Sequence, residues 1–119
     1  MSPTPIYDAS APIACTIDGA EVPARIALVE RMRANLQRLE HTEHGLVLHF
    51  PRRPDVAADL RQFAADEKRC CQFWGFAVEA ADDEVTLRWD APPDARDLLS
   101  DIARYLEGDD PTSTISGLL

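Results

Sequence analysis

The chain has 119 residues, of which 45% are hydrophobic, and this length and composition fit a single domain with a core of ordinary size. Lys and Arg total 12 against 21 Asp and Glu, so the net charge is −9 and nucleic acid is not expected as a partner. No apolar run approaches the roughly 18 residues that a membrane span requires, so no membrane partner is expected either.

The first fourteen residues include three prolines among small polar residues and predict a flexible arm. A long amphipathic helix is expected from Pro23 to about Glu40, because apolar residues recur there at three- and four-residue steps. Arg25 is assigned to the polar face of this helix. Pro23 suits a first helical position, whereas Asp18 and Glu21 form a capping box that would start the helix earlier, and both starts stay open.

Apolar periodicity predicts the remaining elements in the order strand, helix, strand, strand, helix. Alternation at every second residue indicates a half-buried strand, and recurrence at three or four residues indicates a helix. The expected elements are a strand at 46–50, a helix at 54–71, a hairpin of strands at 76–80 and 85–89, and a helix that Pro92 opens and Gly108 ends.

The order αβαββα predicts an α+β fold in which a three-stranded, mainly antiparallel sheet packs against three helices. The chain from 46 to 64 reaches the hairpin through a helix, so one pair of strands is allowed to be parallel. The expected organisation is a flexible N-terminal arm over residues 1–14, a single α+β domain over 15–108 and a disordered tail over 109–119.

Cys70 and Cys71 stand together at the end of the second helix. Successive side chains of a helix point about 100° apart, so the two are not expected to face the same core. Cys71 is expected to point inward, and Cys70 toward the edge near the aromatic residues at 73–76. Packing as small hydrophobic side chains is the alternative for both.

Glu67 lies on the apolar stripe of the same helix, three and four residues before the cysteine pair, so its carboxylate can reach them. A carboxylate is rarely buried without a partner. Glu67 is therefore a candidate to accept a thiol proton, to ligate a cation, or to pair with Arg61, Arg69 or Arg88.

Three cysteines are an odd number without the spacing of a disulfide framework, so reduced thiols in the cytoplasm are favoured over a secreted scaffold. Cys15 follows the arm and is the candidate third thiol. Sulfur ligands select thiophilic ions, and the candidates are Hg, As, Cu and Zn; As(III) takes three thiolates, whereas Hg(II) needs two. A structural zinc site of the familiar kind is disfavoured without paired ligand spacings. The candidate metal ligands are Cys15, Cys70, Cys71 and Glu67.

The motif E-K-R-C-C-Q-F-W-G-F at 67–76 occurs with A-C-T-I-D-G-A-E upstream and V-T-L-R-W-D-A-P-P-D-A-R-D-L-L downstream. This combination resembles small bacterial proteins found alone and as C-terminal extensions of MerR-type heavy-metal-responsive regulators. The resemblance covers roughly 14–106 and implies association with mercury or arsenic response or resistance, with the three cysteines as candidate ligands. Gln72 stands where the family is expected to have proline. No helix-turn-helix precedes Cys15, so this chain is not expected to be the DNA-binding half.

His41 and His44 are weaker metal candidates, because two imidazoles without a third ligand make a poor site. His49 is the candidate base for a cysteine nucleophile. Three functions are weighed: soft-metal or metalloid binding, catalysis by a thiolate, and a non-catalytic module that senses a ligand or binds a partner. Binding is favoured over catalysis. The expected partner is a metal ion or small molecule, with a second copy of the chain or another protein as further candidates.

Overall fold

A computed structural model describes residues 6–8, 10 and 19–107 of the chain. The described residues form three α-helices, two short 3-10 helices (η) and four strands. In chain order these are η1 (Gly19–Glu21), α1 (Val22–Asn35), β1 (Arg38–His41), β2 (Gly45–Pro51), α2 (Pro54–Cys70), β3 (Gly75–Ala80), β4 (Glu84–Asp90), η2 (Pro93–Ala95) and α3 (Arg96–Leu106). The α+β class predicted from the sequence is confirmed.

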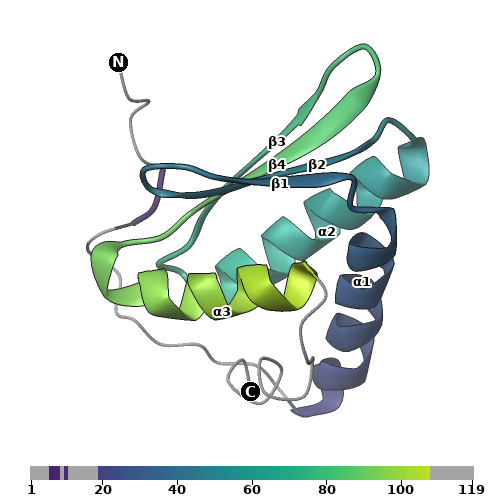
Figure 1. Ribbon diagram of the computed structural model, residues 1–119. Helices are drawn as coiled ribbons and strands as arrows, with labels where there is room; N and C mark the ends of the chain where they lie inside the picture. Colours follow the sequence, from purple (N-terminus) through teal and green to yellow (C-terminus); the bar gives the residue numbers. More distant parts are fainter. Residues whose placement is uncertain (1–5, 9, 11–18, 108–119) are drawn as a thin grey trace.

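The sheet has the strand order β1-β2-β4-β3, and every neighbouring pair is antiparallel. The allowance for a parallel pair is therefore wrong. Since β2 and β3 are both antiparallel to β4, they run in the same direction with β4 between them. The α2 connection thus carries the chain past one strand, and the three α-helices lie together on one side of the sheet (Figure 1).

Strand β1 was not expected, because the first helix was predicted to continue to about Glu40. The α1 helix ends at Asn35, and Leu36 has extended backbone angles of φ −65° and ψ 123°. In β1, Leu39 lies opposite Leu48 of β2 and joins the sheet. Leu36 and Leu39 are three residues apart, a spacing that fits one face of a helix as well as it fits a strand. Periodicity alone therefore predicted that the helix continues through them.

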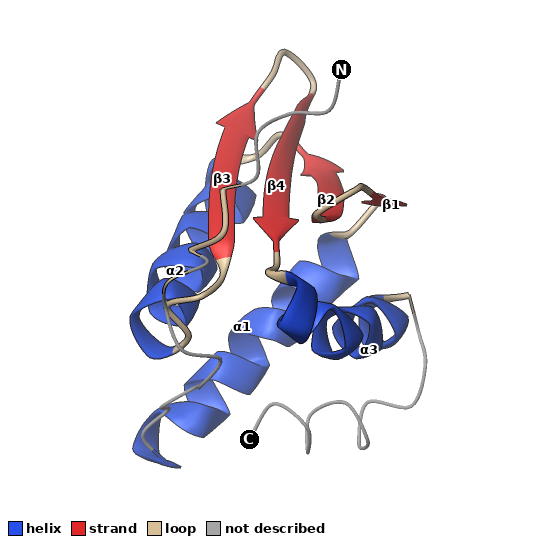
Figure 2. Ribbon diagram, turned by 90° about the vertical axis from the view of Figure 1, so that its left-hand side faces the viewer, coloured by secondary structure: helices blue, strands red, loops and turns tan. Residues whose placement is uncertain are grey.

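The core lies between the helices and one face of the sheet. On this face Leu46 pairs with Trp89 and Leu48 with Leu87, and all four are buried. Phe63 of α2 packs edge-on against Trp89, with ring centroids 5.3 Å apart. Full burial of a side chain of this size contributes about 1.5–3 kcal/mol. This packing holds α2 against the sheet. Figure 2 shows α2 behind the sheet, on the side of β3.

The α3 helix is joined to α1 through Tyr105, which is fully buried. Its hydroxyl donates a hydrogen bond to the Glu30 carboxylate, and the Arg33 guanidinium lies 4.9 Å from the centre of its ring. Burial and the bond to Glu30 raise the pKa of Tyr105 to about 12. The three helices therefore form one connected layer.

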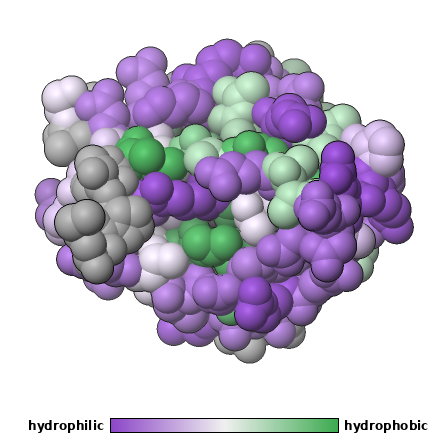
Figure 3. Space-filling view, turned by 90° about the horizontal axis from the view of Figure 1, so that it is seen from above, coloured by the Kyte–Doolittle hydropathy of each residue, from purple (hydrophilic) through white to green (hydrophobic). Residues whose placement is uncertain are grey.

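The other face of the sheet carries charged side chains. His49 Nε2 lies 2.6 Å from Glu40 Oε1, and His49 Nδ1 lies 3.2 Å from Glu84 Oε2. Seen from above, hydrophilic side chains surround several apolar ones (Figure 3).

Part of the predicted N-terminal arm lies against the domain. Ile6 N donates to Asp90 Oδ2 at 3.1 Å, and Asp8 N donates to the Phe73 carbonyl at 3.2 Å. Arm residues 1–5, 9 and 11–14 lie outside the described residues, as do Cys15 and the predicted tail at 109–119.

Gly45 provides a test of the close approach between β2 and β4. A Cβ at Gly45 would lie 1.9 Å from the Trp89 carbonyl oxygen, a backbone atom that cannot move without shifting β4. Gly45→Ala should therefore lower the free energy of unfolding, measured in urea, by about 1–3 kcal/mol or more. Gly19→Ala is the control, because a Cβ there meets nothing within 4 Å. Equal stability of the two variants would contradict the close approach.

Candidate functional site

The two adjacent cysteines lie at the point where α2 ends. Cys70 is the last helical residue, and Cys71 has φ −129° and ψ 78°, outside helical geometry. The expectation that both cannot face the core is wrong, because the side chains are 6% and 4% exposed and belong to the same buried cluster. The 100° rule applies only inside a helix, and the backbone departs from the helix at Cys71.

The backbone around Cys71 is held by two hydrogen bonds. Cys71 N donates to the Glu67 carbonyl at 2.6 Å, and Trp74 N donates to the Cys71 carbonyl at 3.1 Å. Lys68 Nζ also donates to the Trp74 carbonyl at 2.7 Å. The turn after α2 is therefore fixed by bonds on both sides of the cysteine pair.

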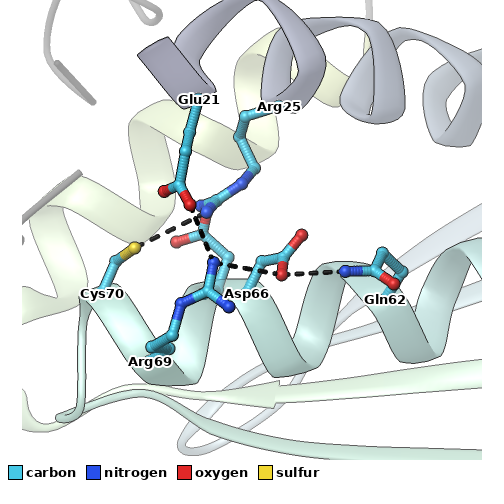
Figure 4. Close-up of polar contacts among 7 residues, drawn as sticks. Glu21, Arg25, Gln62, Asp66, Arg69 and Cys70 are labelled. Atoms are coloured by element: carbon cyan, nitrogen blue, oxygen red, sulfur yellow. Dashed lines mark hydrogen bonds and ion pairs between the residues drawn. The ribbon is translucent and has the colours of Figure 1, made fainter. Parts of the chain in front are cut away.

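Arg25 of α1 contacts both Glu67 and Cys70. Figure 4 shows Arg25 directed toward Cys70. Its Nη1 lies 2.7 Å from Glu67 Oε1, and its Nη2 lies 3.5 Å from Cys70 Sγ. The Arg25 and Glu67 side chains are only 10% and 13% exposed. We call Arg25, Glu67 and Cys70 the Arg25 cluster; it links the start of α1 to the end of α2.

The partner of Glu67 differs from the three arginines that the sequence suggested, which were Arg61, Arg69 and Arg88. Arg25 was assigned to the polar face of its helix, yet it lies three and seven residues before the buried Leu28 and Met32. These spacings place it on the buried face. The signal was present in the sequence, but a charged residue is by default assigned to solvent.

Burial and charge act in opposite directions on this ion pair. Burial raises the pKa of Glu67 above its ordinary value, and the charge and hydrogen bond of Arg25 oppose this without cancelling it. Burial would lower the pKa of Arg25, but the hydrogen bond to Cys70 and the charge of Glu67 outweigh it, so this pKa is raised. Arg25 is therefore a fixed cation beside the Cys70 sulfur.

A chain of polar contacts lies beside the Arg25 cluster. Arg69 Nη2 lies 3.2 Å from Glu21 Oε1 and 3.4 Å from Asp66 Oδ1, and Gln62 Nε2 donates to Asp66 Oδ1 at 2.9 Å (Figure 4). The Arg69 side chain is 61% exposed, so each of its pairs contributes at most about 1 kcal/mol. The buried Arg25–Glu67 pair is the stronger link between the two helices.

The cysteines differ in oxidation state. Cys70 holds a reduced thiol, whereas Cys71 is disulfide-bonded. The expectation of reduced thiols is therefore wrong for Cys71. Cys15 lies outside the described residues. Within the described ranges, no group of three or more His, Cys, Asp or Glu side chains is arranged to hold a metal ion.

The aromatic residues that follow the pair are part of the core. Phe73 and Trp74 are buried, their ring centroids lie 4.5 Å apart, and Trp74 packs on Trp89 at 5.2 Å. The cysteine pair therefore belongs to the same buried cluster as these aromatic residues.

His49 and the helix that carries Cys70 lie on opposite sides of the sheet. His49 is buried, but successive strand residues point to opposite faces, so it lies on the face opposite Leu48 and the helices. The prediction that His49 serves as a base for Cys70 is therefore wrong. His41 is 65% exposed at the end of β1.

Comparison of the chain with protein-family models, curated proteins and solved structures gave no match. In the part of the chain that the structure describes, no helix is both long and apolar enough to cross a membrane.

The buried Arg25–Glu67 pair predicts that replacing one partner destabilises the protein more than the loss of the pair as a whole would suggest. Removing one partner leaves the other charge buried without compensation, so Arg25→Met should lower the free energy of unfolding by about 3–5 kcal/mol. The double variant Arg25→Met with Glu67→Met should be destabilised less than the sum of the two single variants, in a cycle measured by urea unfolding. The control is Arg31→Met, which breaks a pair with Asp59 whose Arg is 55% exposed; it should cost at most about 1 kcal/mol. Strict additivity would contradict the pairing.

Glu67 also predicts a pH dependence. Because burial raises its folded-state pKa, Glu67 keeps its proton to a higher pH in the folded protein than in the unfolded chain, where its pKa has the ordinary value of 4.5. Its contribution to the free energy of unfolding should therefore fall as pH rises from 4.5 toward the higher pKa of the folded state. The stability of the wild type relative to Glu67→Gln, measured by urea unfolding from about pH 4 to about pH 7, should decrease. A difference that is constant or rises with pH would contradict this.

Proposed function

We propose that this chain is a soft-metal or metalloid-binding protein of the Hg, As, Cu class that acts in metal response or resistance. The observation that carries the proposal is the pair Cys70 and Cys71, two consecutive sulfurs in one buried cluster at the end of α2. Sulfur ligands favour thiophilic ions over hard ones such as Mg²⁺ and Ca²⁺. No equally concentrated set of soft ligands occurs elsewhere in the sequence.

The proposed ligands are the thiolates of Cys70 and Cys71, with Cys15 as the third. Two thiolates satisfy Hg(II), whereas As(III) takes all three. Metal binding by a thiol requires its deprotonation, and the Arg25 guanidinium beside Cys70 is a hydrogen-bond donor to the sulfur. Zn(II) is the alternative ion; it is less soft than Hg(II) and would need a fourth ligand.

Glu67 acts behind the thiols in this proposal. Its oxygen holds the Arg25 guanidinium at 2.7 Å, and this contact orients Arg25 toward Cys70 Sγ. A group that orients a ligand contributes to affinity without touching the metal. In this proposal the metal binds after Cys71 has been reduced, and a reducing compartment such as the cytoplasm would favour that state.

A second candidate is an enzyme with Cys70 as a thiolate nucleophile, and the cation at 3.5 Å from its sulfur favours it. The 6% exposure of Cys70 and the position of His49 across the sheet argue for binding instead. Rapid labelling of Cys70 by iodoacetamide in the folded protein would favour the enzyme.

Native mass spectrometry of the fully reduced chain tests the proposal with Hg(II), As(III), Cu(I) and Zn(II) as separate probes. One equivalent of Hg(II) and of As(III) should be retained. The control is the triple variant Cys15→Ser, Cys70→Ser, Cys71→Ser, with its fold checked by circular dichroism. Retention of every ion equally by the folded triple variant would contradict the proposal.

The third ligand has its own prediction. Cys15→Ser leaves the adjacent pair intact, so Hg(II) binding should persist while As(III) binding weakens by about tenfold or more, the loss of roughly 1.4 kcal/mol or more. Competition against a small dithiol measures both affinities. Equal loss of the two ions, or no loss of either, would exclude Cys15 as a ligand specific to As(III).

A further inference from the structure

We infer that the metal site is controlled by oxidation: the disulfide at Cys71 removes one of two adjacent sulfur ligands, and two-electron reduction by a dithiol restores it. The inference rests on the proposed function and names its regulation. It starts from two neighbouring residues in different states, a reduced thiol at Cys70 and a disulfide-bonded sulfur at Cys71.

A disulfide sulfur has no thiolate to give to a metal ion, since ligation needs the deprotonated thiol. With Cys71 oxidised, Cys70 is the cysteine in the described ranges that can act as a thiolate. One thiolate binds a soft ion without the gain in effective concentration that a second, covalently linked ligand provides. Oxidation should therefore weaken binding strongly while leaving Cys70 chemically unchanged.

The reduction balances as an ordinary thiol–disulfide exchange. A thiolate of the dithiol attacks the sulfur bonded to Cys71, the S–S bond breaks, and Cys71 leaves as a thiolate. The second thiol of the reductant then closes its own disulfide and releases the partner cysteine. Two electrons pass to the protein, and the dithiol becomes a cyclic disulfide. Attack on the partner sulfur fits the burial of Cys71, which is 4% exposed.

The surroundings of Cys71 allow its state to change without loss of the fold. The Arg25–Glu67 ion pair and the bonds from Cys71 N to Glu67 and from Trp74 N to Cys71 use no atom of the disulfide. They hold the end of α2 in either state. A metal bound to the reduced form makes the disulfide harder to form, and by the same linkage the disulfide weakens metal binding.

Equilibrium dialysis against arsenite tests the inference on the full chain in two states. One sample keeps its disulfide, and the other is reduced with dithiothreitol that is then removed under argon by gel filtration. Bound arsenic is measured by mass spectrometry of the element. The reduced chain should bind As(III) about 100-fold more tightly. Cys71→Ser is the control: it should bind weakly, and equally, under both conditions.

The possible results separate the redox control from the proposed function. Equal and tight binding by the disulfide form would overturn the redox control while leaving the proposed function standing. No binding of arsenite or Hg(II) by the reduced chain would overturn the proposed function and the control with it. Peptide mapping after alkylation without reduction supplies a second readout: Cys70 should be alkylated, and Cys71 should be found in a disulfide. A disulfide that contains Cys70 would also overturn the inference.

Discussion

The apolar face of the sheet has to be shielded from water, and the rest of the structure depends on this constraint. Leu48 and Trp89 lie on that face, and the three α-helices cover it. Phe63 packs on Trp89 and fixes the position of α2 along the sheet. The end of α2 then lies at the aromatic end of the core, where the backbone leaves the helix at Cys71. The cysteine pair is buried because the core places the helix end there.

The Arg25–Glu67 ion pair is buried at this helix end. Removing two charges from water costs free energy, and the attraction between the charges alone does not offset that cost. A buried pair is often no more stabilising than apolar residues of similar volume, and such pairs serve to specify one arrangement. The Arg25–Glu67 contact specifies how α1 meets α2, and it directs a guanidinium to Cys70 Sγ. The Arg25 side chain therefore contributes both to the contact between α1 and α2 and to the surroundings of the Cys70 thiol.

Sequence periodicity was sufficient for the α+β class, for α2 and for the β3–β4 hairpin, because their apolar residues repeat over many positions. It failed at β1, since Leu36 and Leu39 satisfy a helix and a strand equally well and only pairing with β2 decides between them. It recognised Glu67 as a buried carboxylate but could not find its partner, which comes from a helix 42 residues away in sequence. The disulfide state of Cys71 leaves no pattern in the chain at all.

The proposed function depends on whether Cys70 and Cys71 act together as sulfur ligands. X-ray absorption spectroscopy at the metal edge tests this most directly, on reduced protein loaded with one equivalent of As(III) or Hg(II). Joint ligation by the pair predicts a first coordination shell composed of sulfur, with fewer sulfur neighbours in Cys71→Ser. A shell of oxygen or nitrogen alone, or a spectrum that Cys71→Ser leaves unchanged, would contradict it.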